Sequence, residues 1–241
     1  MTASGDPPRT ALVTGAGRGI GRATAELLAS RGYRVAVNDL DPSAAEAAAH
    51  AIGGFAVAGD VANAESAVRI VEDSEDRLGG VELVVCNAGV SGAWPIEEVT
   101  DEIWTRTLRV NLGGSFHIAR AVVPALKRRR RGSIVTVSSE LALIGAAHLV
   151  HYVSAKSAIL GFTRALAREL APWDIRVNCV APGPVDTEML GPRYRQATYL
   201  ESLPLHRLGT PMEIAEAIVF IAESRWTTGQ VLSPNGGSVI Q

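Results

Sequence analysis

The chain lacks the residues that stabilise small secreted domains and build metal sites. It has only two cysteines among 241 residues, Cys86 and Cys179, and both lie inside apolar runs typical of buried strands. Such positions favour reduced core thiols over a disulfide or a metal site, and His148 and His151 have no third ligand nearby in the sequence. We therefore predict no metal site and a reducing, cytoplasmic setting.

The chain also lacks long apolar runs and an excess of either charge. No run approaches the ~18 apolar residues of a membrane span, and the first ten residues have neither the basic start nor the apolar stretch of a secretory signal. The formal net charge is −2, so no global positive field attracts nucleic acid. We expect neither a membrane nor a nucleic acid as a partner.

What the sequence does contain is an alternation of short runs rich in Val, Ile and Ala with longer segments of helical period, which is typical of βαβ units. Several strand-like runs are apolar throughout, as in parallel strands covered on both faces. No linker, repeat or low-complexity tract divides the chain, so we expect one α/β domain over residues 10–241 after a flexible N-terminus, residues 1–9. Strands are predicted at 10–14, 34–39, 54–58, 81–86, 133–138, 175–180 and 230–233, and helices at 20–32, 42–51, 63–78, 100–130, 152–171 and 211–223.

The longest irregular stretch runs from residue 182 to residue 210 and mixes prolines and glycines with large apolar side chains. Loops of this length in a compact domain are usually functional or mobile. We interpret the stretch as a substrate lid with short helices of its own. A surface excursion or a subunit contact is the alternative.

A glycine-rich turn follows the first predicted strand, and a helical pattern opens directly after it. Gly15, Gly19 and Gly21 permit a tight turn, a close approach to a pyrophosphate and packing of the helix on the sheet. The free N–H groups at the helix start, near Ile20, favour an anion. In this strand–turn–helix context the pattern predicts nucleotide binding.

The acidic residues that end the next two strands indicate which nucleotide binds. Asp39 lies 18 residues after Gly21, close to the spacing expected of the acid that holds an adenosine ribose, and its charge would repel a 2′-phosphate. This predicts NAD rather than NADP, although Arg18 in the glycine turn can meet a phosphate and Asp39 can instead cap a helix. Asp60, followed by Val61, can accept from the adenine amino group or cap the helix near residue 63.

A second constellation has the groups needed to move a proton. Tyr152 and Lys156 are four residues apart in a predicted helix, so they share one face, and Ser139 precedes the tyrosine by 13 residues. A cation beside a phenol lowers the pKa of the phenol from ~10 toward neutrality. The alternative is an amphipathic helix with a tyrosine and a lysine on one side.

Together these residues resemble the short-chain dehydrogenase/reductase family over nearly the whole chain, from about residue 10 to residue 240. The resemblance implies a single Rossmann-type domain, doubly wound around a mostly seven-stranded parallel sheet, with a nicotinamide cofactor and hydride exchange between a carbonyl and an alcohol. The motifs in the family's order and spacing are the glycine pattern at 14–21, Asn87-Ala88-Gly89, Asn111, Ser139, Tyr152, Lys156 and Pro182-Gly183.

The resemblance also implies roles for these side chains. Tyr152 is the general acid/base, and Lys156 lowers its pKa and binds the nicotinamide ribose. Ser139 donates to the substrate oxygen; Ser138 is the alternative, but strand alternation points neighbouring side chains to opposite faces and the family's interval selects Ser139. The backbone at Asn111 holds a water that links Lys156 to solvent, unless Asn111 is a plain polar helix residue.

The rest of the cofactor site is likewise implied by the resemblance. Asn87-Ala88-Gly89 lets the backbone run along the cofactor. Pro182 and Gly183 pack against the nicotinamide, and Val185 and Thr187 hydrogen-bond its carboxamide, which leaves the pro-S hydride exposed. Near the C-terminus the chain departs from the family, because residues 235–237 read Asn-Gly-Gly where Asp-Gly-Gly is usual.

We expect an NAD(H)-dependent enzyme acting on a secondary alcohol or ketone of moderate, largely apolar size. A rival is an NADPH-dependent 3-oxoacyl-carrier-protein ketoreductase, favoured by five cations at 127–131 and opposed by Asp39; the cations alternatively form a solvated helix end. A nucleotide sensor without turnover is a further alternative.

A homotetramer is expected, with a dimer second. The expected pocket residues are Trp94, Leu141, Leu143, Leu149, Met189 and Leu190, with His148 or His151 as polar contacts.

Overall fold

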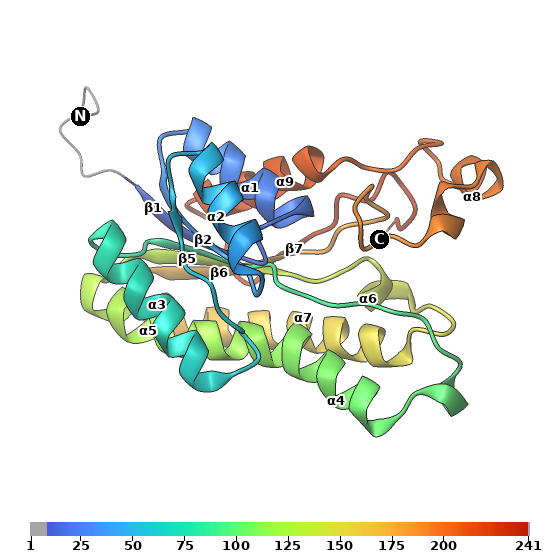
Figure 1. Ribbon diagram of the computed structural model, residues 1–241, viewed down its shortest axis with the longest axis horizontal. Helices are drawn as coiled ribbons and strands as arrows, with labels where there is room; N and C mark the ends of the chain where they lie inside the picture. The colour runs from blue at the N-terminus through green and yellow to red at the C-terminus, as the bar shows by residue number, and fades with distance from the viewer. Residues whose placement is uncertain (1–8, 241) are drawn as a thin grey trace.

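Seven parallel strands form one sheet in the order β3-β2-β1-β4-β5-β6-β7 (Figure 1). The computed structural model describes residues 9–240, so most of the predicted flexible segment, residues 1–9, lies outside the described residues. The chain winds outward from β1 in one direction and then from β4 in the other, which confirms the doubly wound α/β class. The strands are β1 (Thr10–Thr14), β2 (Arg34–Asn38), β3 (Phe55–Ala56), β4 (Leu83–Cys86), β5 (Gly132–Val137), β6 (Ile175–Val180) and β7 (Val231–Leu232).

Helices cover both faces of the sheet, as Figure 1 shows. On one face α1, α2 and α9 bury an apolar cluster, and on the other α3, α5 and α7 bury a second one. Strand residues alternate between the two clusters, Val13 and Val85 facing the first and Leu12 and Val84 the second. The helices are α1 (Gly19–Ser30), α2 (Pro42–Ala51), α3 (Ala64–Leu78), α4 (Asp101–Leu108), α5 (Gly114–Arg129), α6 (Leu141–Ile144), α7 (Val150–Leu170), α8 (Ala197–Ser202) and α9 (Pro211–Glu223).

The single helix predicted over residues 100–130 is wrong in one respect. A π-helical segment, Arg109–Gly113, separates α4 from α5. Within it the buried Asn111 amide donates to the carbonyl of Val90 at 2.9 Å and accepts from the N–H of Val90 at 3.1 Å. Such local widening of a helix is frequent at functional sites. It places Asn111 against the chain that leaves β4.

The edge strands are shorter than predicted. β3 and β7 each pair over two residues, because each has a neighbour on one side only. The two cysteines are free and buried, and burial raises the pKa of the Cys86 thiol to about 12. Among residues 9–240, no helix is both long and apolar enough to cross a membrane.

The stretch between β6 and α9 has short helices of its own, as predicted, and its two ends are joined. These helices are a 3₁₀ turn at Pro192–Arg195 and α8. At the base, the N–H of Gly209 donates to the carbonyl of Pro184 and the N–H of Asp186 to the carbonyl of Gly209, both at 2.9 Å. The loop therefore leaves and rejoins the body of the protein at one point, and Figure 1 shows it projecting beyond the sheet.

Candidate active site

A cavity of about 510 Å³ opens at the carboxyl ends of the strands. This edge of a doubly wound sheet is where ligands bind, because the order of the strands reverses there between β1 and β4. Its floor comes from the ends of β4 and β5, and the loop between β6 and α9 forms the opposite wall. We call this loop, residues 186–208, the lid.

The structure brings Ser139, Tyr152 and Lys156 together on one wall of the cavity. A side-chain hydrogen bond joins Ser139 to Tyr152, and the Lys156 Nζ atom lies 5.8 Å from the centroid of the Tyr152 ring. The Ser138 hydroxyl instead donates to the backbone carbonyl of Lys156 at 2.7 Å. Ser138 therefore ties β5 to α7, and Ser139 is the serine whose hydroxyl meets the phenol.

The pKa values of the two titratable groups move in opposite directions. Burial raises the pKa of Tyr152 to about 12, and the Ser139 hydrogen bond lowers it by less. Burial lowers the pKa of Lys156 to about 8. The predicted depression of the tyrosine pKa by Lys156 is therefore opposite to what this arrangement gives. The reason is that the Lys156 ammonium donates to the carbonyl of Val137 at 2.9 Å, while partial burial removes water from the phenol.

Gly89 allows three elements to meet behind Lys156. A Cβ atom at this position would lie 2.6 Å from Asn111 Oδ1 and 3.4 Å from Lys156 Nζ, so only glycine permits the approach. The side chain of Asn111 hydrogen-bonds the backbone of Val90 and the carbonyl of Thr107. The predicted role of its backbone in holding a water stays a prediction.

The glycine turn has the tight geometry that the sequence predicted. Gly15 has a φ of +61°, and a Cβ there would lie 2.7 Å from the Cα of Ala88. At Gly21 a Cβ would come within 2.3 Å of the Gly15 carbonyl oxygen. The Asn87 amide donates to the carbonyls of Thr14 and Gly15 at 2.9 and 3.0 Å. The end of β4 thus holds the turn in place, and the cradle fits a group that approaches the backbone closely.

The acidic residues after β2 and β3 are not helix caps. The N-terminal caps of α2 and α3 are Asp41 and Asn63. Asp39 instead accepts from the N–H of Gly17 at 2.9 Å, so its half-buried carboxylate lies against the glycine turn. Asp60 accepts from the N–H of Ala62 at 2.8 Å and closes a turn before α3.

Arg18 points away from Asp39 and toward the lid. Its guanidinium Nη1 lies 3.1 Å from a carboxylate oxygen of Glu188. Both side chains are largely exposed, so the pair adds little stability. The contact nevertheless shows that the Arg18 side chain lies on the lid side of the glycine turn. Thr187 lies on the same side, where its methyl group would lie 3.5 Å from a Cβ atom at Gly19.

The cavity includes four of the expected pocket residues. Leu141, Leu149, Met189 and Leu190 line it, whereas Trp94, Leu143 and His148 are not among its lining residues. Trp94 packs edge-on against the buried His151 ring, with 5.2 Å between centroids, and His148 is exposed in the turn before α7. The substrate contacts expected of Trp94 and His148 stay predictions.

Three further lining residues were not among the expected pocket residues. Tyr194 and Tyr199 belong to the predicted lid, so a lid assignment was the signal that could have found them. Glu140 follows Ser139, and no local pattern marks it, because its partner comes from the far end of the chain.

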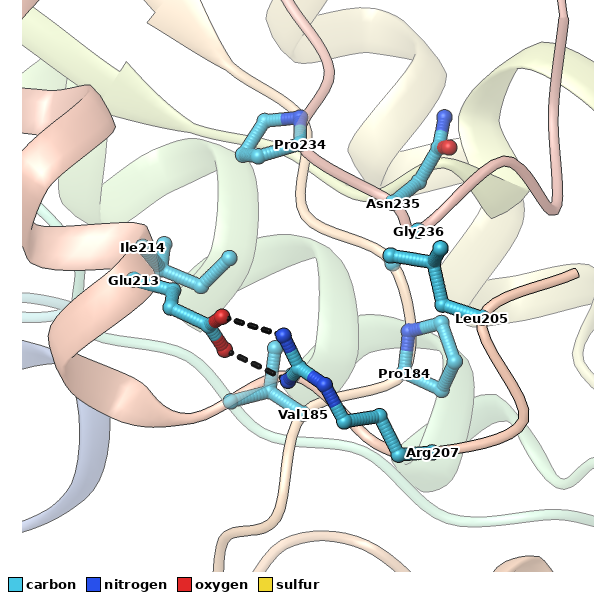
Figure 2. Close-up of a pocket in the computed structure, with 11 residues that line it drawn as sticks. Pro184, Val185, Leu205, Arg207, Glu213, Ile214, Pro234, Asn235 and Gly236 are labelled. Carbon is cyan, nitrogen blue, oxygen red and sulfur yellow. Dashed lines mark hydrogen bonds and ion pairs between the residues drawn. The ribbon is translucent and has the colours of Figure 1, made fainter. Parts of the chain in front are cut away.

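A second cavity, of about 130 Å³, lies behind the segment 183–185, which also borders the first (Figure 2). Figure 2 shows Arg207 and Glu213 side by side on its wall, where two hydrogen bonds join them. Glu213 also accepts from the N–H of Thr210 and completes the capping box that starts α9. These contacts pin the point where the lid rejoins the protein.

The basic run at 127–131 is largely paired. Lys127 lies 3.5 Å from Glu169, Arg129 pairs with Glu75 and Arg131 with Glu82. Arg130 lies over the Trp173 ring, 5.4 Å from its centroid. Because the run precedes β5, it lies at the amino ends of the strands, and within one chain the cavity is at the opposite edge of the sheet.

Comparison with known proteins identifies relatives along nearly the entire chain. The family model described as short chain dehydrogenase matches residues 9–198. The chain is 39% identical to a 3-oxoacyl-(acyl-carrier-protein) reductase of Vibrio cholerae over 95% of its length and 96% of the relative. The corresponding reductase of Escherichia coli is 36% identical over 95% and 96%.

Solved structures agree with this. A short-chain type dehydrogenase/reductase from Mycobacterium marinum superposes with a TM-score of 0.91 at 32% identity, covering 97% of this chain and 96% of the other. A 3-ketoacyl-(acyl-carrier-protein) reductase from Brucella melitensis, complexed with NADH, gives a TM-score of 0.93 at 32% identity, covering 96% and 98%.

The lowered pKa of Lys156 can be measured directly, because Lys127 and Lys156 are the only lysines of the sequence. Protein labelled with ¹³C-lysine gives two Cε signals, and Lys127→Arg assigns them. We expect the Lys156 signal to titrate near the value of about 8 that its burial produces. A midpoint at the ordinary lysine value of ~10.4 would contradict the desolvation argument.

Proposed function

The chain belongs to the short-chain dehydrogenase family, and from this premise we propose that it transfers a hydride between NAD(H) and a secondary alcohol or ketone of moderate, largely apolar size. The observation that carries the proposal is the wall formed by Ser139, Tyr152 and Lys156, which faces a cavity at the carboxyl edge of the sheet. Leu141, Leu149 and the lid supply the apolar side chains around it.

The proton chemistry follows from the states of these groups. Bound NADH supplies the hydride, and the carbonyl oxygen then gathers negative charge. Tyr152, with a pKa of about 12, is protonated at neutral pH and donates its phenolic proton to that oxygen. Ser139 donates a hydrogen bond to the same oxygen. The raised pKa keeps the phenol protonated at neutral pH, which is the state that carbonyl reduction requires.

The residues of the nucleotide end fit NAD. The glycine turn at 15–21 cradles the pyrophosphate, and the Asp39 carboxylate accepts hydrogen bonds from the ribose hydroxyls. Arg18, the one residue of the turn suited to a 2′-phosphate, is engaged with Glu188. The relative from Brucella was solved with NADH, which supports the same cofactor here. Val185 and Thr187 line the cavity where the nicotinamide carboxamide would lie.

A second candidate reaction is reduction of a 3-oxoacyl chain on a carrier protein. It is favoured by the names of relatives that are 36–39% identical. Two features weigh against it. Asp39 disfavours the NADPH with which that chemistry was expected, and the basic run at 127–131 is paired with acidic residues of its own chain.

The role of the phenol is tested with Tyr152→Phe, with Tyr33→Phe as the matched control on the far side of the fold. We expect reduction of a ketone panel that includes 3-oxoacyl thioesters to fall by about 10²–10⁴-fold in Tyr152→Phe, because the proton donor is gone. Tyr33→Phe keeps full activity. NADH binding, followed by nicotinamide fluorescence, is unchanged in both variants.

Wild-type protein that binds NADH but turns over no member of the panel would favour a nucleotide sensor instead. Turnover of the 3-oxoacyl thioesters alone would favour the second candidate. Equal activity of Tyr152→Phe and wild type would contradict the proposed acid.

Cofactor choice is tested by titrating NADH and NADPH into wild type and Asp39→Ala. Wild type is expected to bind NADH more tightly, because the Asp39 carboxylate accepts from the ribose and repels a phosphate. Asp39→Ala loses about tenfold in NADH affinity, equivalent to about 1.4 kcal/mol of charge-assisted hydrogen bonding, and narrows the gap to NADPH. Tighter binding of NADPH by wild type would contradict the argument.

We also propose that the chain assembles as a homotetramer. Large apolar side chains lie exposed on α9 and just after it, with Phe220 at 66% and Trp226 at 99% exposure, and Phe116 on α5 is 42% exposed. Exposed apolar groups of this size mark interaction surfaces. Sedimentation equilibrium should give four times the chain mass of 25.3 kDa, and Phe220→Glu should lower it. A monomer at micromolar concentration would refute the assembly.

A further inference from the structure

Glu140 is a buried acid that the proposed chemistry does not use. It directly follows Ser139, has 6% of its surface exposed and lines the cavity. Its backbone N–H donates to the carbonyl of Pro182 at 2.8 Å, so it also touches the segment expected against the nicotinamide. Among residues 9–240, no lysine, arginine or histidine acts on its carboxyl group, whose single side-chain partner is the hydroxyl of Ser238. A buried carboxylate without a cation is costly.

Counting protons on Ser238 indicates the state of Glu140. The Ser238 hydroxyl oxygen lies within hydrogen-bonding distance of Glu140 Oε2 and also of the carbonyl oxygen of Asn235, the latter at 2.9 Å. A hydroxyl has one proton, so it cannot donate to both. If Glu140 is protonated, it donates to the Ser238 oxygen, and Ser238 donates to Asn235. Each of the three groups is then satisfied.

The chain on either side of Ser238 packs against the cofactor side of the cavity. The N–H of Gly183 donates to the carbonyl of Pro234 at 3.0 Å, and a Cβ at Gly183 would lie 2.6 Å from the Cα of Asn235. The Asn235 amide donates to the carbonyl of Val239 at 2.9 Å, a bond that an aspartate could not make. Figure 2 shows Pro234 and Asn235 on the wall of the small cavity that the segment 183–185 also borders.

We propose that Glu140 is a positioning residue which, as a neutral acid, fastens the C-terminal segment 233–239 to the turn that carries Ser139. The proposal rests on the proposed function for its effect on activity, and on the hydrogen-bond geometry alone for the fastening. Loss of the proton leaves two acceptors competing for the single proton of Ser238. The segment then separates from the turn, and the walls around Ser139 and Gly183 loosen together.

The surroundings of Glu140 contain few groups that titrate. The segment 233–239 has none, and Asp186, next to the nicotinamide segment, is paired with Arg195. The others that share the cavity wall are Tyr152, Lys156, Tyr194 and Tyr199. Burial raises the pKa of Glu140, which is the direction the proposal requires.

The sign of the pH effect follows. The folded protein holds the Glu140 proton more tightly than the unfolded chain, whose glutamates titrate near pKa ~4.3. Stability contributed by this group is therefore complete below that value and is lost as pH rises through the folded pKa. Glutamine keeps a donor and an acceptor but cannot ionise.

The test compares wild type with Glu140→Gln, Glu140→Ala and Ser238→Ala. We expect the melting temperature of wild type, relative to Glu140→Gln, to decline as pH rises. Over the same range the protection of the amides in residues 233–239, measured against their intrinsic exchange rates, falls in wild type only. At neutral pH, Glu140→Gln keeps kcat within about threefold, whereas Glu140→Ala and Ser238→Ala lose about tenfold in kcat/KM and bind NADH more weakly, because the wall at Gly183 loosens with the turn.

A difference in melting temperature between wild type and Glu140→Gln that is the same at every pH would overturn the proposal, and so would a Glu140→Gln variant that behaves like Glu140→Ala. If Glu140→Ala fails to fold, Ser238→Ala removes the same contact from the other side. Should wild type reduce no ketone, the proposed function fails, and melting and amide exchange still decide the fastening.

Discussion

The satisfaction of buried polar groups at the carboxyl edge of the sheet is the constraint on which the site depends. Strands end there, so carbonyls lose their ladder partners inside the protein, and side chains must replace them. The ammonium of Lys156 donates to the carbonyl of Val137, and the amide of Asn87 donates to the carbonyl of Gly15. The hydroxyl of Ser138 donates to a backbone carbonyl of α7. Each of these bonds also sets the position of a group in the proposed reaction. Fold and site are therefore held by the same contacts.

The same burial explains why the proton chemistry has a direction. A phenol and an ammonium placed together in water would both be charged only over a narrow range near pH 10. Desolvation pushes their pKa values in opposite directions, to about 12 for Tyr152 and about 8 for Lys156, so that the phenol keeps its proton and the amine holds its charge weakly. A phenol of this kind is present as the acid at neutral pH, which is the form that reduction of a carbonyl requires. The oxidised nicotinamide carries a positive charge, and alcohol oxidation would depend on that charge to draw the phenolic proton away.

Much of the fold was predictable from the sequence because its signals are local. Strand runs buried on both faces and helix starts such as Thr210-Pro211 depend on neighbours within a few residues. What the sequence did not reveal depends on contacts across the chain. The π-helical segment accompanies the hydrogen bonds between Asn111 and Val90. The position of Glu140 can be interpreted only through its hydrogen bond with Ser238, which lies 98 residues further along the chain. The pKa of Tyr152 was predicted with the wrong sign for a related reason, because helical spacing gives the distance to a lysine but not the loss of water.

The segment after β6 contacts three other parts of the molecule. Its first residues meet the C-terminal segment through Gly183 and the turn after β5 through Pro182. A few residues later Glu188 reaches the glycine turn at Arg18. The contacts at Pro182 and Gly183 are made by backbone atoms, so a displacement of these two residues moves the turn after β5 and the C-terminal segment together. Proteins in which one short segment borders both ligands have a direct route for each ligand to affect the other's site, without any motion of the sheet.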